Sequence, residues 1–371
     1  MSKKKIFTLT CHDVYNYGAS LQAFALQQYL FANDYDTEII NYKPDYLNTK
    51  YRLSWYVPKS SSYYERCKTN PFYRALYVLR RYILEHRTIS RRLAFDRFTK
   101  KYLKLTSEYN NYIELCQNPP IGDIYIVGSD QVWNNSPLLN GWDAAFFLRF
   151  GMNTTRRISY AASFGSTKQC PDIMQDWLRT LAAVSIREES SLSLLKDTVI
   201  KAEIVCDPVF LLSKEEWIRS LELKQSPCNY ILIYNLSGDN HNLIRQAKEL
   251  AAKENLEIHY IVTEHKLRGA RNIKGAGPKK FLEEILNASY VFSDSFHATA
   301  FSLIFKKLFF TYSFKNELAS QRMKGLLERL GLQCQYNPIS IERVLSEKFD
   351  CSEKLNAMVS ESKHWLNNNL I

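Results

Sequence analysis

The chain has 371 residues, of which 46% are hydrophobic and 23% charged, a composition typical of a soluble globular protein with roughly two or three domains. Its eight cysteines are never closer than 17 residues apart, so their spacing indicates neither a zinc site nor a disulfide framework. No stretch approaches the ~20 apolar residues of a membrane span, and the apolar run near the N-terminus is too short for a signal peptide. We therefore expect a cytoplasmic protein.

Apolar, strand-like runs alternate with helical patterns along the chain, which predicts an α/β protein with parallel sheets. A break near Asp207-Pro208 separates two halves, because proline disfavours helical geometry in the residue before it. The simplest architecture is two Rossmann-like halves with a cleft between them. The predicted strands are 6–10, 38–41, 124–127, 158–161, 184–186, 230–235, 258–262 and 290–292, and the predicted helices include 19–33, 241–253 and 279–287.

Residues 44–112 interrupt this alternation and are predicted to form an inserted helical excursion. Residues 80–104 hold nine Lys/Arg against two acidic residues, a net +7 of the chain's +11. Just before and within this stretch, Leu76, Leu79 and Ile83 share one helical face, giving a basic amphipathic pattern. Three interpretations remain open: a solvated helix face, contact with an anionic membrane surface, or nucleic-acid binding. No nucleic-acid motif accompanies the charge.

The segment 290–305 reads as a short apolar strand, a polar turn and an apolar helix. The turn contains Asp294 and Ser295, and the helix begins at Phe296-His297. Backbone N–H groups and the positive end of the helix dipole converge at such a turn and suit a phosphate or carboxylate. His297 would then be a proton donor beside the anion. The alternative is an ordinary turn whose histidine caps or packs.

Other polar residues follow predicted strands, where ligands collect in open α/β folds. Ser129 and Asp130 follow strand 124–127, and Asp130 is a candidate base or hydroxyl acceptor, with an Asx turn as the alternative. Arg187 follows strand 184–186, where it could clamp an anion bidentately or pair with a nearby acid.

The loop after the first strand offers a further group of candidate binding residues, and Gly18 in that loop is expected to adopt a positive φ. Two cations downstream of the His297 helix are candidate donor contacts. The loop residues are His12, Asn16, Tyr17 and Gln22, and the cations are Lys315 and Arg322.

Taken together, these segments resemble the polysaccharide pyruvyl transferase family, in family order and over nearly the whole chain. Ala298 stands where glycine is common in the family, and Lys307-Leu308 replaces a usual Lys-Pro, so the pocket shape and the choice of acceptor could differ. The matching segments are Asn16–Leu26, Gly128–Trp133, Tyr160–Gly165, Ser185–Glu189, Asp207–Leu212, Gly277-Pro278 and Ser293–Phe301.

The resemblance implies a fold similar to two-domain GT-B glycosyltransferases. It implies an acceptor-side domain over 1–205 and a donor-side domain over 206–371, with the last helix packing back on the first domain. The implied reaction moves pyruvate from phosphoenolpyruvate onto two hydroxyls of a sugar, forming a cyclic ketal and releasing phosphate. His297 would be the acid, Arg187 would neutralise the donor, and Asp130 or His12 would be the base.

Phosphoenolpyruvate is a co-substrate in this scheme, so no cofactor and no metal are expected. The acceptor would be a polysaccharide or a lipid-linked oligosaccharide at the inner face of the membrane, with the basic segment on the anionic surface. Two alternatives remain: a glycosyltransferase that uses a sugar nucleotide, and a non-catalytic scaffold for envelope assembly.

Overall fold

The chain divides into two compact units. The computed structural model describes residues 3–48, 57, 63–135, 142–165, 167–196, 198–226, 228–263, 265–314, 317–347 and 350–371. The first unit comprises Met1–Arg187, Ser191–Ile204 and Asn369–Ile371, and the second comprises Glu188–Ser190 and Val205–Asn368. Each unit contains a five-stranded parallel sheet with helices, which confirms the predicted α/β class.

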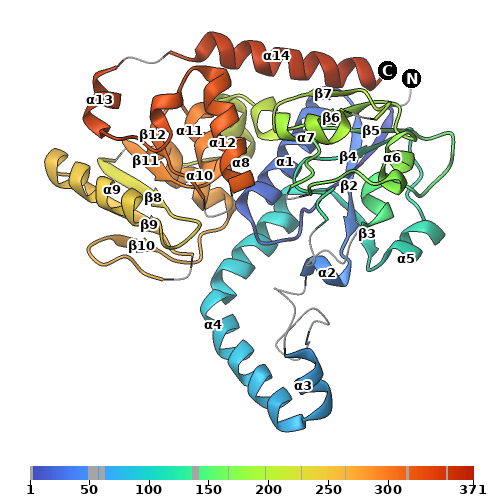
Figure 1. The fold of residues 1–371 in the computed structure, drawn as a ribbon, viewed down its shortest axis with the longest axis horizontal. Helices are drawn as coiled ribbons and strands as arrows, with labels where there is room; N and C mark the ends of the chain where they lie inside the picture. The colour runs from blue at the N-terminus through green and yellow to red at the C-terminus, as the bar shows by residue number, and fades with distance from the viewer. Residues whose placement is uncertain are drawn as a thin grey trace. The chain divides into compact units, whose positions relative to one another are not determined.

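The sheet of the first unit has the strand order β3-β2-β1-β4-β5, with every neighbouring pair parallel (Figure 1). Its β4 is buried at all four positions, as expected of a parallel strand covered on both faces. The strands are β1 (Lys5–Leu9), β2 (Asp36–Tyr42), β3 (Leu105–Tyr109), β4 (Ile124–Val127) and β5 (Arg156–Ser159), with a separate pair, β6 (Val184–Ile186) and β7 (Ala202–Ile204).

Asparagine side chains cap two of the main helices of the first unit. Asn16 caps the first by accepting hydrogen bonds from the N–H groups of Gly18 and Ala19, and Asn70 caps the longest, which continues with Pro71. The helices are α1 (Tyr17–Ala32), α2 (Asp45–Asn48), α3 (Tyr64–Thr69), α4 (Pro71–Tyr102), α5 (Tyr112–Gln117), η2 (Ala144–Phe147) and α6 (Asp172–Leu178), and α7 (Glu189–Leu195) follows at the boundary between the units.

Two local predictions for this unit are wrong. The segment 44–112 is not wholly helical, because β3 lies within it and pairs with β2 at the edge of the sheet. A strand at the edge of a sheet is only partly covered, so its residues need not be apolar, and β3 therefore lacks the apolar pattern by which a strand is predicted. Gly18 is a helical residue of α1, and the positive φ of this loop, +34°, occurs at Tyr15 instead.

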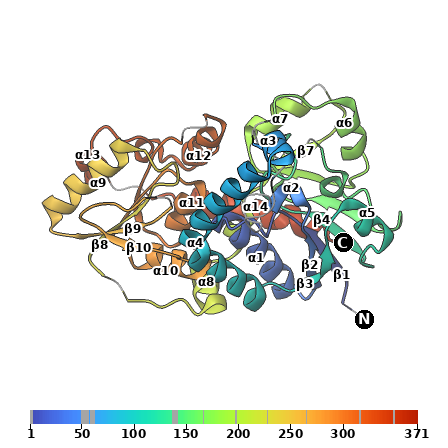
Figure 2. The same ribbon diagram turned by 90° about the horizontal axis from the view of Figure 1, so that it is seen from below.

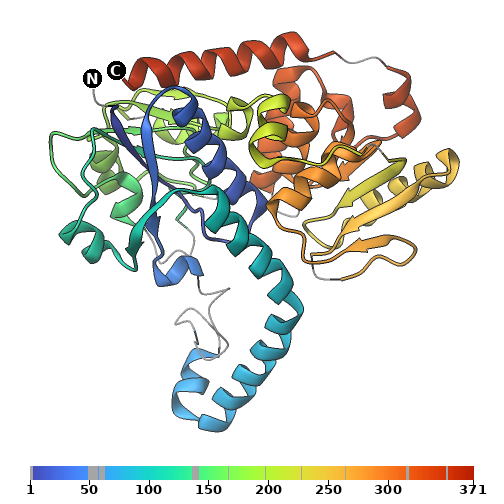
Figure 3. The same cartoon turned by 180° about the vertical axis from the view of Figure 1, so that it is seen from behind.

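Helix α4 is anchored at one end. Near its C-terminus, Phe95 and Phe98 are buried against aromatic rings of the preceding elements, including Tyr17 and Phe24. Toward its N-terminus, where α3 lies against it, Leu76 and Leu79 are exposed (Figure 3, cyan). The side chains of 81–88, and with them the predicted contribution of Ile83, lie outside the described residues.

The second unit repeats this plan with the strand order β10-β9-β8-β11-β12, again parallel throughout. Helix α9 lies on one face of this sheet and α10 and α11 on the other (Figures 1 and 2). The strands are β8 (Tyr230–Tyr234), β9 (Glu257–Ile261), β10 (Arg271–Ile273), β11 (Tyr290–Ser293) and β12 (Leu308–Thr311). The helices are η3 (Pro208–Leu211), α8 (Lys214–Leu221), α9 (His241–Glu254), α10 (Pro278–Asn287), α11 (Phe296–Ile304), α12 (Glu317–Leu330), η4 (Gln333–Gln335), α13 (Ile341–Ser346) and α14 (Ser352–Asn369).

Each sheet has one point where the strand order reverses direction: between β1 and β4 in the first unit, and between β8 and β11 in the second. Ligands of open α/β sheets bind outside the carboxyl ends of the strands at such a switch point. The topology therefore directs attention to the residues that follow these four strands. Within the described part of the chain, no helix has the length and apolar character needed to cross a bilayer.

Candidate active site

A buried hydrogen-bond chain joins four segments at the switch point of the first unit: the residues that follow β1, β4 and β6, and helix α1. The Thr10 hydroxyl donates to the Ser129 carbonyl at 2.7 Å and receives the Gln22 amide at 2.8 Å. The Ser129 hydroxyl in turn lies 3.2 Å from Nη1 of Arg187. These four side chains are each at most 8% exposed. The structure therefore brings together three predicted site residues, Gln22, Ser129 and Arg187. It adds Thr10, which was predicted only as the last residue of a strand.

Arg187 is held at the end of β6 by these contacts. A guanidinium this deeply buried is a strong donor toward phosphate or carboxylate oxygens, because its field is poorly screened. Its fork geometry also favours bidentate contact with such an anion. The position suits the predicted role in neutralising a donor.

Asp130 follows Ser129 in an unusual backbone conformation, with φ at +80°. Its carbonyl accepts from the N–H of Ser163, and its Oδ1 accepts from its neighbour Gln131 N at 2.8 Å. Non-glycine residues with positive φ are uncommon, and they concentrate at functional sites where the surrounding structure imposes the strain. The half-buried carboxylate is thus fixed at the carboxyl edge of the sheet, as a base or hydroxyl acceptor requires.

His12 is buried, with 1% of its surface exposed. Its ring nitrogens lie 3.2 Å from the Thr10 carbonyl and 3.2 Å from Oδ1 of Asn41. Burial lowers the pKa of His12 below its usual 6.5. Both contacts are to oxygen acceptors and act in the opposite direction, so it is burial that favours the neutral imidazole. Asp130, which is only half-buried, is the more accessible of the two candidate bases.

Asn16 and Tyr17 serve the start of α1. The Asn16 side chain is occupied by its capping bonds, and Tyr17 is 3% exposed with the Arg91 guanidinium over its ring at 5.1 Å. Burial raises the pKa of the Tyr17 hydroxyl to about 12. These two predicted binding residues therefore shape the loop of the switch point through its backbone and packing.

Asp294 organises the switch point of the second unit. Its carboxylate is 1% exposed and accepts from the N–H groups of Leu236 at 2.6 Å and Ser237 at 3.0 Å. Burial raises the pKa of Asp294, although these hydrogen bonds act in the opposite direction. The carboxylate thus ties the end of β11 to the loop after β8.

His297 lies in the first turn of α11, with 14% of its side chain exposed. Its Nε2 is 3.6 Å from Oδ2 of Asp207, a distance at which the two form an ion pair only when the histidine is protonated. Nε2 is buried and has no hydrogen-bond partner among the described residues. A buried ring nitrogen left in this state is available to a ligand.

The start of α11 also lacks a side-chain cap. Ser295 is its N-cap residue, but the Ser295 side chain makes no capping hydrogen bond, so the first N–H groups are not satisfied by that side chain. The nearby Asn235 side chain is fully buried, and its Nδ2 lacks a partner within the described ranges. Two buried polar atoms and an uncapped helix start therefore occur on one sheet edge, an arrangement suited to an anion.

The two downstream cations are less informative. Arg322 is half-buried on α12, a helix that contacts α11. Lys315 lies outside the described residues.

Sequence reasoning missed Asp207 and Asn235. From the sequence, Asp207 is interpreted only as part of the break before Pro208. The available signal was that Asp207–Leu212 is one of the segments that match the family. Asn235 directly follows β8, so the strand-end rule that identified Ser129 and Asp130 could have found it.

The solved structures that the chain resembles are distant. UDP-N-acetylglucosamine 2-epimerase from Rickettsia bellii is 13% identical with a TM-score of 0.47, covering 99% of this chain and 96% of that one. UDP-GlcNAc 2-epimerase from Methanocaldococcus jannaschii is 11% identical with a TM-score of 0.47, at 98% and 99% coverage. A spinosyn rhamnosyltransferase is 10% identical with a TM-score of 0.42, at 97% and 96% coverage. Likenesses this weak say nothing of function.

The sequence comparison is more decisive. No curated protein matches the chain significantly. The family model described as polysaccharide pyruvyl transferase, however, matches residues 16–316, most of the chain. The matched range contains β4, β8 and β11 and the candidate residues Gln22, Ser129, Arg187 and His297. The chain belongs to the polysaccharide pyruvyl transferase family.

Proposed function

We propose that the protein transfers pyruvate from phosphoenolpyruvate to two hydroxyls of a sugar in a polysaccharide or lipid-linked oligosaccharide. The product is a cyclic pyruvate ketal, and phosphate is released. The observation that carries the proposal is His297, whose buried Nε2 has no hydrogen-bond partner among the described residues and lies at an uncapped helix start. That combination supports a proton donor acting beside a bound anion.

The chemistry balances with these groups. His297 protonates the methylene carbon of the enol phosphate, which leaves an oxocarbenium-like carbon that the first sugar hydroxyl attacks. Departure of phosphate regenerates such a carbon, and the second hydroxyl closes the ring. The two sugar hydroxyls lose one proton each. One of these protons returns to His297, which gave its own to the methylene carbon, and the other leaves with the phosphate.

Four further groups support these steps. In the second unit, the N–H groups at the start of α11 neutralise an anionic group of the donor, and in the first unit Arg187 is the buried cation suited to such a group. Asp130, strained at +80° at the edge of its sheet, relieves the attacking hydroxyl of its proton. Asp207 orients His297 from 3.6 Å.

Isothermal titration tests the donor. Wild-type protein is titrated with phosphoenolpyruvate and, separately, with a panel of nucleotide sugars, and Arg187→Ala is compared with wild type. Saturable binding of phosphoenolpyruvate that Arg187→Ala weakens supports the proposal. Binding of a nucleotide sugar with no binding of phosphoenolpyruvate would contradict it and favour a glycosyltransferase.

We also propose that α4 holds the enzyme on an anionic membrane surface, where a lipid-linked acceptor would reside. Phe72, Leu76 and Leu79 share one helical face and are 71%, 53% and 56% exposed. Arg74 and Arg80 are exposed on the same stretch. Apolar residues flanked by cations are typical of helices that lie in the interface of anionic bilayers.

Part of the basic segment, in contrast, is used within the protein. Arg91 lies over the rings of Tyr17 and Phe95, and Lys104 pairs with Asp36 at 2.8 Å. The exposed N-terminal half of α4 is therefore the part to test.

Vesicle sedimentation is the assay for this contact. Arg74→Glu with Arg80→Glu should abolish binding to vesicles containing phosphatidylglycerol, whereas Lys248→Glu, an exposed charge reversal on α9, should not. Equal binding by the wild type, the Arg74→Glu/Arg80→Glu double variant and Lys248→Glu would count against a membrane role for α4.

A further inference from the structure

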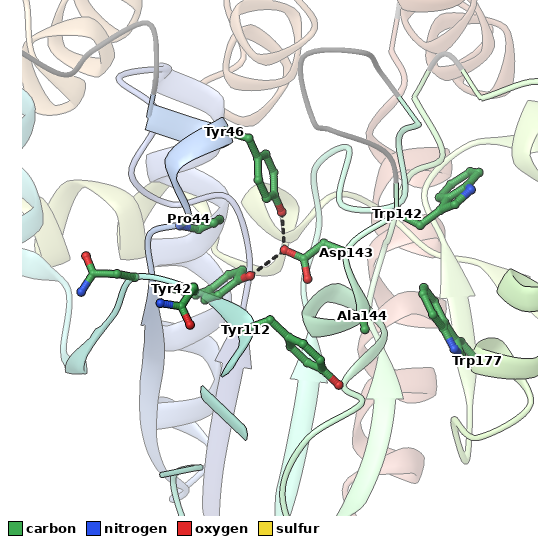
Figure 4. A pocket seen from close by; sticks show the side chains of 10 residues that line it. Tyr42, Pro44, Tyr46, Tyr112, Trp142, Asp143, Ala144 and Trp177 are labelled. Atoms are coloured by element: carbon green, nitrogen blue, oxygen red, sulfur yellow. Dashed lines mark hydrogen bonds between the residues drawn. The ribbon is translucent and has the colours of Figure 1, made fainter. Parts of the chain in front are cut away.

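A pocket in the first unit is lined by aromatic and hydroxyl-binding side chains that take no part in the chemistry above. Its volume is about 540 Å³, within the range of roughly 300–1,000 Å³ typical of small-ligand sites. Figure 4 shows its side chains around a central carboxylate. The lining residues are Tyr42, Pro44, Tyr46, Asn110, Asn111, Tyr112, Trp142, Asp143, Ala144 and Trp177.

The central carboxylate is Asp143. Its Oδ2 accepts the hydroxyls of Tyr42 at 2.6 Å and Tyr46 at 2.5 Å, and its Oδ1 accepts the N–H of Ala145 at 2.8 Å. Burial and the Asp143 charge raise the pKa of both tyrosines, so they keep their protons and donate them to the carboxylate. A hydroxyl oxygen that donates its proton keeps its lone pairs, so the Tyr42 hydroxyl can also accept from a hydroxyl group of a ligand.

Aromatic surfaces flank this polar centre. Trp142 and Trp177 lie on one side of Asp143, and Tyr42 and Tyr46 lie on the other (Figure 4). The indole of Trp177 packs on Phe147 with ring centroids 5.0 Å apart, which fixes one aromatic surface on the core. Flat aromatic faces pack on the apolar C–H faces of sugar rings, while hydrogen-bonding groups between them select hydroxyls.

The charge of the pocket selects against the donor. Among its described lining residues there is no lysine, arginine or histidine, and Asp143 is negative. Phosphoenolpyruvate would be repelled here. A neutral, polyhydroxylated ring meets no such penalty and matches the acceptors that the two tyrosines present.

The pocket opens at the functional edge of its sheet. Tyr42 ends β2, and Asn110 and Asn111 directly follow β3, so the lining comes from the same carboxyl edge that carries Asp130. The Cys11 thiol connects the two places: burial and the charges of both Asp130 and Asp143 raise its pKa. Asp130, the candidate base, and Asp143, in the pocket, therefore both lie close enough to Cys11 to act on its thiol, within one unit.

We propose that this pocket is the subsite for the neutral saccharide acceptor, with its tyrosines and Asp143 reading hydroxyls and Trp142 and Trp177 holding the ring faces. The identification of the bound saccharide as the acceptor rests on the proposed function. The binding of a neutral saccharide at these residues is itself independent of any reaction.

Ligand-observed NMR titration without phosphoenolpyruvate measures saccharide binding separately from the proposed reaction. The full chain is titrated with a panel of methyl hexosides, N-acetylhexosamines and their disaccharides. Trp142→Ala should weaken binding of the recognised saccharide by about tenfold or more, and Tyr46→Phe, which removes only a hydroxyl, by a few-fold. Tyr290→Phe, which removes a hydroxyl from a half-buried tyrosine of the second unit, should bind as wild type.

The outcomes are distinct. Saccharide binding that Trp142→Ala and Tyr46→Phe both weaken, while phosphoenolpyruvate binding stays unchanged, supports the subsite even if no pyruvyl transfer is found. Wild-type protein that binds no member of the panel, or variants that bind as wild type, would overturn it. In the latter case, saccharide-dependent phosphate release would still leave the proposed function standing.

Discussion

Replacing Asp207 by asparagine tests whether the buried carboxylate supports the acid. In the structure, Oδ1 of Asp207 accepts the N–H of Val209 at 3.1 Å, which caps η3, and Oδ2 lies 3.6 Å from His297 Nε2. An asparagine oxygen can keep the capping bond, so the substitution removes the charge without removing the cap. The expected loss is therefore catalytic and not structural.

The distance sets the magnitude. Opposite unit charges at 3.6 Å attract by about 4–5 kcal/mol at an effective dielectric constant near 20. Desolvation and partial exposure offset part of this attraction, so we expect a net loss of about 2 kcal/mol, equivalent to roughly a 30-fold fall in kcat. Phosphate release from phosphoenolpyruvate, with a saccharide acceptor, measures the rate, and thermal unfolding measures the fold.

Asp350→Asn is the matched control, because Asp350 also caps a helix start, at Ser352 N, but is exposed. It should keep full activity. An Asp207→Asn protein as fast as wild type would refute the role of the carboxylate. A fall in activity that tracks a large drop in Tm would show that Asp207 is structural instead.

Four other substitutions probe the remaining groups. His297→Asn should abolish turnover at unchanged Tm, since the acid is lost with little change in volume; near-normal phosphate release would remove His297 from the mechanism. Arg187→Ala should raise KM for phosphoenolpyruvate roughly tenfold or more, and Ser129→Ala, which loses only the contact to Nη1, should raise it less; an unchanged KM in both would make Arg187 structural. His12 has a lowered pKa, so the unfolded chain binds its proton more readily: stability is fully present above about pH 6.5 and falls as pH drops toward the folded-state pKa, by at most ~1.4 kcal/mol per pH unit. Thermal unfolding from pH 7 to 5 should show a flatter pH dependence for His12→Gln, and identical curves would exclude the linkage.

Most of the central strands could be predicted from the sequence. Strand 124–127 was predicted with the bounds of β4, because a short apolar run at the centre of a parallel sheet leaves little ambiguity. Strand 184–186 was predicted with the bounds of β6, which lies in the separate pair with β7. Edge elements were harder. The edge strands β10 and β12 were not predicted, and β3 lies within the stretch predicted to be a helical excursion. For β3 and β10 the reason is that an edge strand is half-covered and its sequence need not be apolar, whereas β12 is apolar and buried at three of its four positions.

The candidate site could be predicted only one residue at a time. Strand-end position identified Asp130 and Arg187, and the helix start identified His297. The partner Asp207 is 90 residues away in sequence, and its proximity arises from packing that no local pattern encodes. The saccharide pocket was missed for the same reason, since Tyr42, Asp143 and Trp177 come from three separate segments.

The most direct test of the central claim is product analysis. Wild-type protein and His297→Asn are incubated with phosphoenolpyruvate and the saccharide panel, and released phosphate and the masses of the saccharides are measured together. The account predicts that, with wild type alone, one saccharide gains the mass of pyruvate less water while an equal amount of phosphate appears. Phosphoenolpyruvate left intact with every saccharide of the panel, or pyruvylated product formed equally by His297→Asn, would contradict it.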